Sequence, residues 1–312
     1  MSPILTLTLN PALDLTGDLA TLTPGAVNIM QSGHLHPAGK GINVARVLKD
    51  LGAEVRVSGF LGAENAAPFH ALFAEAQIED RFMVVPGSTR INVKLVEQDG
   101  QVTELNFPGV QVSEQAATTF AGNLPQLTAD LEYIVLAGSL PRGISPLRLR
   151  KWMEELSQAG KKILFDSSGA ALDEGLLAGP TLIKPNQHEL AAWAQEPLES
   201  KAALMSAAEA LQARYDIEHI VVSRGADGVL WLAGDHWWQA AATPMNVVST
   251  VGAGDSMVAA FAWALSQQLA PEETLRLACA VSAQAVTQIG VGIHDKAQLA
   301  ALMASVNITS IR

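Results

Sequence analysis

The stretch 249-STVGAGDSMVAAFAWAL-265 places three small residues and an acid directly before a long apolar run. We expect Gly252, Ala253 and Gly254 to form a tight turn and Asp255 to lie in the first turn of a helix. Two interpretations fit this pattern. Asp255 can be a helix-capping residue with no chemical role. Alternatively, backbone N–H groups at the positive end of the helix bind an anion, with the carboxylate beside it.

The composition of the 312 residues excludes several classes of protein. With 49% hydrophobic and 16% charged residues, the chain can bury a sizeable core. A formal net charge of −11 argues against nucleic acid and membrane surfaces as partners. The single cysteine, Cys279, excludes an internal disulfide and a cysteine-based metal cluster, and its apolar surroundings predict a buried thiol. The opening MSPILTLTLNPALD does not read as a signal peptide, and the apolar runs are too short to span a bilayer, so we expect a cytoplasmic protein.

Strand-like and helical patterns alternate along most of the chain. Strand-like runs occupy 3–10, 54–60, 133–139, 162–168, 181–186 and 219–225. Helical patterns lie between them, for example at 41–52, 146–160 and 201–215. This alternation predicts βαβ units and therefore an α/β fold, with a mainly parallel sheet covered by helices on both faces. We see no repeats and no linker, so we expect a single domain over 1–312.

Two stretches interrupt this alternation. In 90–107, two alternating runs flank Asp99-Gly100, which is a strong hairpin signal. The second stretch, 12–33, is strand-like and has no crossover helix before it. We expect the two stretches, about 12–33 and 88–108, to form a small β lid over the edge of the sheet. An ordinary edge hairpin is the alternative.

Polar residues follow several of the predicted strands, where ligands bind in open α/β sheets. They are Asp166-Ser167-Ser168, Lys184-Pro185-Asn186 and Ser223-Arg224-Gly225. The common nucleotide motifs are absent, because Gly33 lies too far from Gly39-Lys40 for a P-loop and Met257 breaks the G-x-G-x-x-G spacing. The sequence also lacks G-x-S-x-G and H-E-x-x-H, the motifs of common hydrolases.

Two other segments resemble the signatures of the PfkB, or ribokinase-like, carbohydrate kinases. They are 38-AGKGINVARVLKDLGAEVRVSGFLG-62, with Asn43 after a Gly-rich turn, and 249-STVGAGDSMVAAFA-262. Further similar blocks follow in the family order, namely 138-GSLPRG-143, 166-DSSG-169, 184-KPNQHE-189 and 223-SRGADG-228. The resemblance covers the whole chain. It implies a ribokinase-like three-layer α/β/α sandwich with a small β lid.

The 1-phosphofructokinase branch of this family is the most similar, through AGKGINVA, TRINVKL with a following NFPG, and STVGAGDSMV. That branch transfers the γ-phosphate of ATP to O6 of fructose 1-phosphate, which gives fructose 1,6-bisphosphate. Tagatose-6-phosphate kinase and 6-phosphofructokinase of the same family remain alternatives. An alternative of a different class is a sugar-phosphate sensor without catalytic activity.

The resemblance assigns roles at the nucleotide end of the site. Asp255 is the expected base for the sugar hydroxyl, and the N–H groups of Gly252, Ala253 and Gly254 offset the charge of the phosphoryl group in transfer. Mg²⁺ accompanies ATP, and Asn186 with Glu189 is expected near the metal, acting through water; a helix start with Glu in its first turn is the alternative. Some relatives also require a monovalent cation such as K⁺, which the sequence leaves open. The expected ATP-binding residues are Lys184, Asn186, Ser223, Gly225, Gly228, Ser249 and Gly254.

The resemblance also assigns residues at the sugar end. Arg90 is the expected ligand of the substrate phosphate, because a guanidinium grips phosphate oxygens in a fork. Lys40 stands where the 6-phosphofructokinase branch has Gly, so it is either a second phosphate-binding cation or an exposed lysine at a helix start. Exposed apolar residues on a lid favour pairing, so we expect a homodimer through the lid. The expected sugar-binding residues are Asp14, Gly39, Lys40, Asn43, Arg90 and Ser139.

Overall fold

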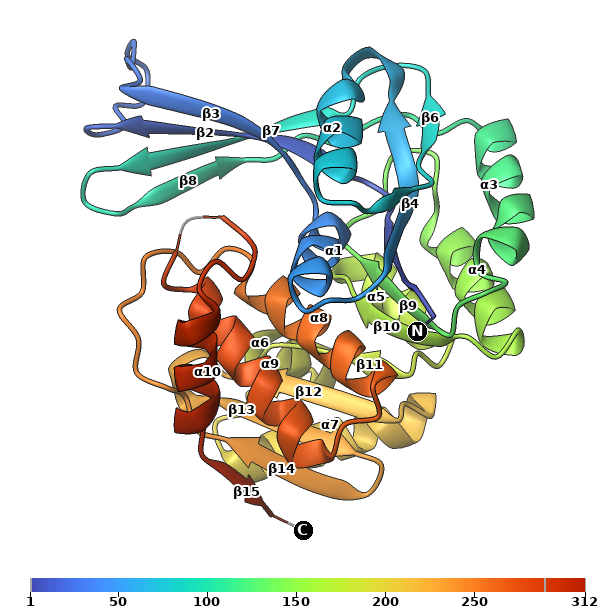
Figure 1. The fold of residues 1–312 in the computed structure, drawn as a ribbon, viewed down its shortest axis with the longest axis vertical. Coiled ribbons are helices and arrows are strands. Elements are labelled where there is room, and N and C mark those ends of the chain that lie inside the picture. The colour runs from blue at the N-terminus through green and yellow to red at the C-terminus, as the bar shows by residue number, and fades with distance from the viewer. Residues whose placement is uncertain (1, 289, 312) are drawn as a thin grey trace.

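The predicted strands become neighbours in one large sheet of a computed structural model (Figure 1). The structure describes residues 2–288 and 290–311, so positions 1, 289 and 312 of the expected domain lie outside it. Over these residues the main sheet has eleven strands in the order β15-β14-β13-β12-β11-β10-β9-β1-β4-β5, with β6 also paired to β4. The parallel strands are β1 (Ile4–Thr8), β4 (Val55–Gly62), β5 (Glu79–Asp80), β6 (Met83–Val85), β9 (Tyr133–Ala137), β10 (Lys162–Asp166), β11 (Leu182–Ile183) and β12 (His219–Ser223).

One edge of the main sheet is antiparallel, which the sequence interpretation missed. Here β13 (Val229–Ala233), β14 (His236–Ala240) and β15 (Ile308–Ser310) follow β12 in the sheet. The turn between β13 and β14 contains Gly234 at φ 60°. Two apolar runs around Gly234-Asp235 are a hairpin pattern, so this edge could have been predicted.

Helices cover both faces of the sheet, as predicted. The helices on one face are α1 (Lys40–Asp50), α2 (Ala67–Glu75), α8 (Ala253–Ser266), α9 (Pro271–Ala285) and α10 (Lys296–Ser305). The helices on the other face are α3 (Glu114–Leu127), α4 (Pro146–Gln158), α5 (Gly169–Leu176), α6 (Gln187–Ala194) and α7 (Lys201–Tyr215). These layers confirm the three-layer α/β/α sandwich.

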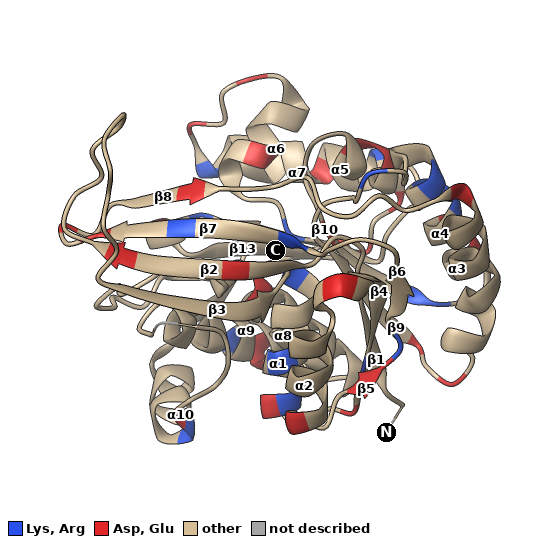
Figure 2. Cartoon of the chain, turned by 90° about the horizontal axis from the view of Figure 1, so that it is seen from above, with Lys and Arg blue, Asp and Glu red and all other residues tan. Residues whose placement is uncertain are grey.

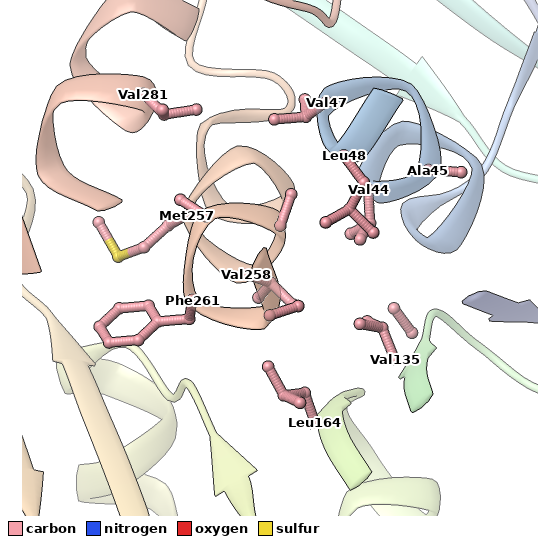
Figure 3. Close-up of a cluster of buried hydrophobic side chains, with 14 of the residues drawn as sticks. Val44, Ala45, Val47, Leu48, Val135, Leu164, Met257, Val258, Phe261 and Val281 are labelled. Atoms are coloured by element: carbon pink, nitrogen blue, oxygen red, sulfur yellow. The ribbon is translucent and has the colours of Figure 1, made fainter. Parts of the chain in front are cut away.

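Each face of the sheet has its own hydrophobic core, because alternate residues of a strand point to opposite faces. On β9, Val135 packs into one core, whereas Ile134 and Leu136 pack into the other. Figure 3 shows the first core, in which side chains of α1 and α8 meet Val135 and Leu164 of the sheet. This packing fixes the starts of α1 and α8 beside each other.

The lid is a separate four-stranded sheet that extends away from the main body (Figure 1). Its strands are β3 (Ser32–Ala38), β2 (Ala12–Leu19), β7 (Arg90–Glu97) and β8 (Val102–Leu105), in that order. β7 and β8 form the hairpin expected around Asp99-Gly100. The sequence placed the end of this part of the lid at residue 33, but β3 extends to Ala38. The strand ends at the turn formed by Gly39, where φ is 139°.

The two faces of the lid differ in polarity. The register places an apolar row on one face, with Leu15, Leu35 and Leu105 being 36%, 52% and 49% exposed. The other face carries Asp14 and Lys94, which form an ion pair. The lid therefore presents polar groups on one side and an uncovered apolar surface on the other.

Cys279 lies partly buried against the first core, and desolvation raises the pKa of its thiol to about 12. Such a thiol stays protonated at neutral pH, which agrees with the expected structural role. Across residues 2–288 and 290–311, no helix combines the length and the apolar composition needed to cross a membrane.

Candidate active site

The start of α8 is built around Gly252, which precedes the helix with φ 81°. A side chain there would collide with Val291, since its Cβ would lie 2.6 Å from Val291 Cγ2. Asp255 follows in the first helical turn and is buried. Its Oδ2 accepts a hydrogen bond of 2.8 Å from Asn43 Nδ2 on α1, and no capping bond to the helix backbone is seen among the described residues. The capping interpretation therefore does not describe Asp255.

Burial raises the pKa of Asp255 to about 6, and the nearby charge of Asp166 contributes to the increase. The hydrogen bond from Asn43 and the charges of Lys40 and Lys184 oppose it. A carboxylate with this pKa is mostly ionised at pH 7, yet it binds a proton more readily than an exposed aspartate. Asp255 thus has the properties of a general base.

Lys40 lies at the start of α1 and forms an ion pair with Asp166, at the end of β10. Its Nζ lies 3.2 Å from both carboxylate oxygens of Asp166. Burial alone would lower the pKa of Lys40, but the charges of Asp166 and Asp255 outweigh it and raise the pKa overall. Lys40 is therefore a partly buried cation between two carboxylates. Asp166 was noted in the sequence only as a strand-end residue, and that position was the signal for its place in the site.

Lys184 follows β11 and reaches the start of α8. A Cβ on Gly254 would lie 3.2 Å from Lys184 Nζ, so the glycine leaves room for the ammonium group. The ammonium and the first N–H groups of α8 thus concentrate positive potential in one place.

The remaining residues expected at the nucleotide lie in the neighbouring turns. Ser223 N donates to Pro185 O at 3.1 Å, which joins the ends of β11 and β12. Gly225 and Gly228 have φ 56° and 85°, and Gly228 packs directly against the backbone of β14. Ser249 Oγ accepts from Val251 N at 3.2 Å. The positive φ angles account for the two glycines and the side-chain bond accounts for Ser249, whereas the contact of Ser223 is made by its backbone.

Asn186 and Glu189 form a capping box at the start of α6. Asn186 Oδ1 accepts from the N–H groups of His188 and Glu189, both at 2.9 Å, and Glu189 Oε2 accepts from Asn186 N at 2.9 Å. The alternative of a helix start is therefore realised, and no hydrogen bond to Glu189 Oε1 is seen within the part of the chain that the structure describes.

The described residues contain no group of three or more His, Cys, Asp or Glu side chains placed to hold a metal ion. A Mg²⁺ ion that arrives with phosphate oxygens keeps several of its waters and needs few oxygen donors from the protein. The charge of Asp166 acts on both Asp255 and Lys40, and that of Glu189 acts on Lys40, so these two carboxylates are near enough to suit this arrangement.

Arg90 links the lid to the main sheet. Its guanidinium donates to the carbonyls of Asn10, Phe107 and Pro11 at 2.9, 3.0 and 3.3 Å, and to Ser139 Oγ at 3.4 Å. Burial lowers the pKa of Arg90, and the charge of Asp14 opposes this effect. The structure thus brings Arg90 and Ser139 together as expected, but it directs most of the Arg90 donors to backbone carbonyls.

Two residues beside those expected to bind the sugar were missed in the sequence. Asn10 Nδ2 donates to Ser139 Oγ at 3.1 Å and to Leu140 O at 3.2 Å, so it positions the turn after β9. Lys94 Nζ lies 2.7 Å from Asp14 Oδ2. The segments MSPILTLTLNPALD and TRINVKL contain Asn10 and Lys94, but only the three-dimensional structure shows their contacts.

The sequence pattern of the pfkB family carbohydrate kinases matches residues 7–297. The 1-phosphofructokinase of Vibrio cholerae serotype O1 is 49% identical over 308 residues, covering 99% of this chain and 97% of that protein. The 1-phosphofructokinase of Escherichia coli K12 is 47% identical over 305 residues, covering 98% of this chain and 97% of that protein.

Phosphofructokinase-2 of Escherichia coli has a similar structure. In complex with potassium it superposes with a TM-score of 0.90 at 27% identity, covering 97% of this chain and 99% of that one. Its tetrameric inhibited form gives a TM-score of 0.89 at 27% identity, with the same coverage. The match of the family pattern to nearly the whole chain and the identities near one half agree with the arrangement around Asp255. The chain therefore belongs to the pfkB family of carbohydrate kinases.

Proposed function

We propose that the chain is an ATP-dependent kinase that phosphorylates fructose 1-phosphate at O6 and produces fructose 1,6-bisphosphate. The observation that carries this proposal is the buried Asp255 at the start of α8, held by Asn43 beside Lys40 and Lys184. The substrate is inferred from the relatives: proteins named 1-phosphofructokinase are almost half identical to this chain over nearly its full length.

In the proposed reaction, Asp255 accepts the proton of the sugar O6 hydroxyl as O6 attacks the γ-phosphorus of ATP. Asn43 orients the carboxylate through its hydrogen bond to Oδ2. The N–H groups of Gly252, Ala253 and Gly254 face the oxygens of the transferred group and stabilise their charge. We assign Lys40 to this end of the site as well, because its ammonium lies near Asp166 and Asp255.

Mg²⁺ bound with ATP would neutralise part of the phosphate charge, with Glu189 holding one of its waters. Lys184, Ser223 and Ser249 surround the expected nucleotide position, and Gly225 and Gly228 shape its turn. Binding of a monovalent cation such as K⁺ is part of the proposal, because phosphofructokinase-2 of Escherichia coli has been solved in complex with potassium. ATP and sugar phosphates are metabolites of the cytoplasm, where we place the protein.

At the sugar end, Asp14 accepts hydrogen bonds from sugar hydroxyls, and the Gly39 backbone and Asn43 add further contacts. Arg90 and Ser139 lie where the phosphate of the substrate is expected. The uncovered apolar face of the lid supports a homodimer in which two lids pack against each other. Light scattering on the protein and on Leu35→Glu should give a dimer and a smaller species; a wild-type monomer would contradict this part.

The function is tested by coupled ADP release with ATP and Mg²⁺, comparing kcat/KM for fructose 1-phosphate, fructose 6-phosphate and tagatose 6-phosphate. We expect a clear preference for fructose 1-phosphate. A higher rate with either 6-phosphate would assign the chain to a sister branch of the family. No turnover of any of the three would favour a sugar-phosphate sensor.

A further inference from the structure

Lys94 lies on the polar face of the lid and has no role in the function proposed so far. It belongs to β7, where Arg90, Asn92 and Lys94 alternate with Ile91 and Val93 and therefore share one face. Figure 2 shows acidic positions of β2 beside basic positions of β7 on this sheet. The lysine side chain is only 15% exposed, so it is not a solvated surface lysine.

Asp14 lies between the two cations of this face. It is opposite Asn92 in the register, and it accepts a hydrogen bond of 3.3 Å from Asn92 Nδ2. Lys94 Nζ lies 2.7 Å from Asp14 Oδ2. The charge of Asp14 also acts on Arg90, where it partly opposes the lowering of the pKa by burial. Arg90 and Lys94 are four residues apart, which is about 13 Å along a strand. Their long side chains can therefore both reach the space beside Asp14.

The two cations differ in the hydrogen-bond donors that remain. Arg90 has five N–H donors, and four of its bonds already go to three carbonyls and Ser139. Lys94 has three donors, and Asp14 is its one ion-pair partner among residues 2–288 and 290–311. Lys94 therefore has two donors for a ligand, whereas Arg90 has one unless it releases a backbone contact.

A phosphate dianion beside Asp14 would be repelled by the carboxylate unless a cation offsets it. Lys94 supplies that charge at the carboxylate itself, and Arg46 of α1 adds positive potential nearby, as its effect on His36 shows. His36 stands opposite Asp14 on β3, and burial lowers its pKa despite the charge of Asp14. His36 is therefore neutral at pH 7 and does not offset the negative charge of Asp14. Lys94 is the cation that does so.

We propose that Lys94 is a specificity-determining residue whose ammonium binds the phosphate already carried by the sugar, through the two donors not directed to Asp14. The proposal rests on the proposed function, because it presupposes a phosphorylated sugar at this end of the site. The sequence predicted that Arg90 binds the phosphate of the substrate. In this proposal Arg90 mainly holds the lid to the main sheet, and Lys94 supplies the free hydrogen-bond donors for the phosphate.

The test compares Lys94→Gln and Lys94→Arg with wild type, using the sugar phosphate that wild type turns over fastest. Lys94→Gln should raise KM for that sugar phosphate by about tenfold or more, because a charge-assisted contact is lost, while kcat and KM for ATP stay within about twofold. Lys94→Arg should retain most of the affinity. Lys151→Gln, which neutralises an exposed lysine of α4, is the matched control and should behave as wild type.

Competitive inhibition separates the phosphate from the sugar hydroxyls. Inhibition by inorganic phosphate should weaken in Lys94→Gln by the same factor as KM rises, whereas inhibition by free fructose should not change. If KM for the sugar phosphate is unchanged, or if fructose inhibition weakens as much as phosphate inhibition, Lys94 acts only through Asp14 and the proposal is overturned. Calorimetric titration of wild type and Lys94→Gln with inorganic phosphate gives the same comparison even if no sugar phosphate is turned over. A failure of the proposed function can therefore be told apart from a failure of the proposal about Lys94.

Discussion

The helices α6 and α8 each carry an acid in the first turn, and they use it differently. At α6, Glu189 accepts a hydrogen bond from the N–H of Asn186 and completes a capping box. At α8, Asp255 turns away from its own helix and accepts a hydrogen bond from Asn43, a residue of α1. The first acid is satisfied by residues three positions away, and the second by a residue 212 positions away.

The acid of α6 stabilises the fold, whereas the acid of α8 has the properties of a reactive group. The capping box stabilises the start of α6, and its groups are largely used up by the local backbone. Asp255 contributes nothing comparable: burial raises its pKa to about 6, so the folded state binds its proton more tightly than the unfolded state does. The stability associated with this group is present at low pH and is lost as pH rises through about 6. A buried carboxylate that lowers the stability of the folded state at neutral pH is a candidate functional residue.

The largest effect is expected for Asp255→Asn. Loss of the general base should lower kcat by about 10²- to 10⁴-fold, while KM for ATP changes little. The melting temperature at pH 8 should not fall, because a buried charge is removed. Steady-state kinetics and thermal unfolding measure the two effects. Asp295→Asn is the control, since Asp295 does cap α10 and asparagine caps equally well; a similar loss of kcat there would contradict the distinction.

The second-largest effect is expected in the pH dependence of kcat/KM, on the acid side of the profile. In wild type, kcat/KM should fall about tenfold per pH unit below about 6, as Asp255 becomes protonated. Lys40 lowers the pKa of Asp255, so Lys40→Met should move this limb to higher pH. Profiles of kcat/KM for both proteins between pH 5 and about 8 make the comparison. An unshifted limb would show that Lys40 and Asp255 are not coupled.

A third test asks whether Glu189 does more than cap. Glu189→Gln keeps an oxygen that accepts the N–H of Asn186, so the melting temperature should hardly change. Its lost charge should raise the Mg²⁺ concentration needed for half-maximal rate by about tenfold if the residue holds a metal-bound water. Titration of the rate with Mg²⁺ measures this. An unchanged requirement would reduce Glu189 to its structural role.

The smallest effect is expected for Asn186→Ala, which removes the cap itself. The protein should lose about 1 kcal/mol of stability, as other caps do. Urea unfolding measures it, and Ser200→Ala at the start of α7 is a matched cap deletion. A much smaller loss for Asn186→Ala would mean that the capping box contributes little and that the two helix starts are less different than their geometry indicates.

Sequence patterns predicted what depends on near neighbours. The βα alternation, the hairpin around Asp99-Gly100 and the helix start after Gly252 are all set by residues close together in the chain. The family resemblance then selected Asp255 over the capping alternative. Patterns of this kind could not predict the ion pairs of Lys40 with Asp166 and of Lys94 with Asp14, because these depend on side-chain directions from elements far apart in sequence.

The strand β15 and the end of β3 show the other kind of miss. β15 pairs with β14 across some seventy residues, so nothing local indicates that Ile308 to Ser310 form a strand. β3 carries His34 and His36 instead of an apolar alternation, so its continuation to Ala38 followed from pairing with β2 and not from its own residues. Tertiary contacts decided both cases.

The strand order also governs how the chain folds while it is being made. β1 lies between β4 and β9, and both of its faces are buried, but β9 begins only at Tyr133. At synthesis rates of about 5–20 residues per second, β1 waits roughly ten seconds for its second neighbour. During that time its apolar residues are available to other chains. The yield of folded protein should therefore depend on how quickly translation proceeds from β1 to β9, and synonymous codon changes in that interval are a way to alter the yield without altering a single residue.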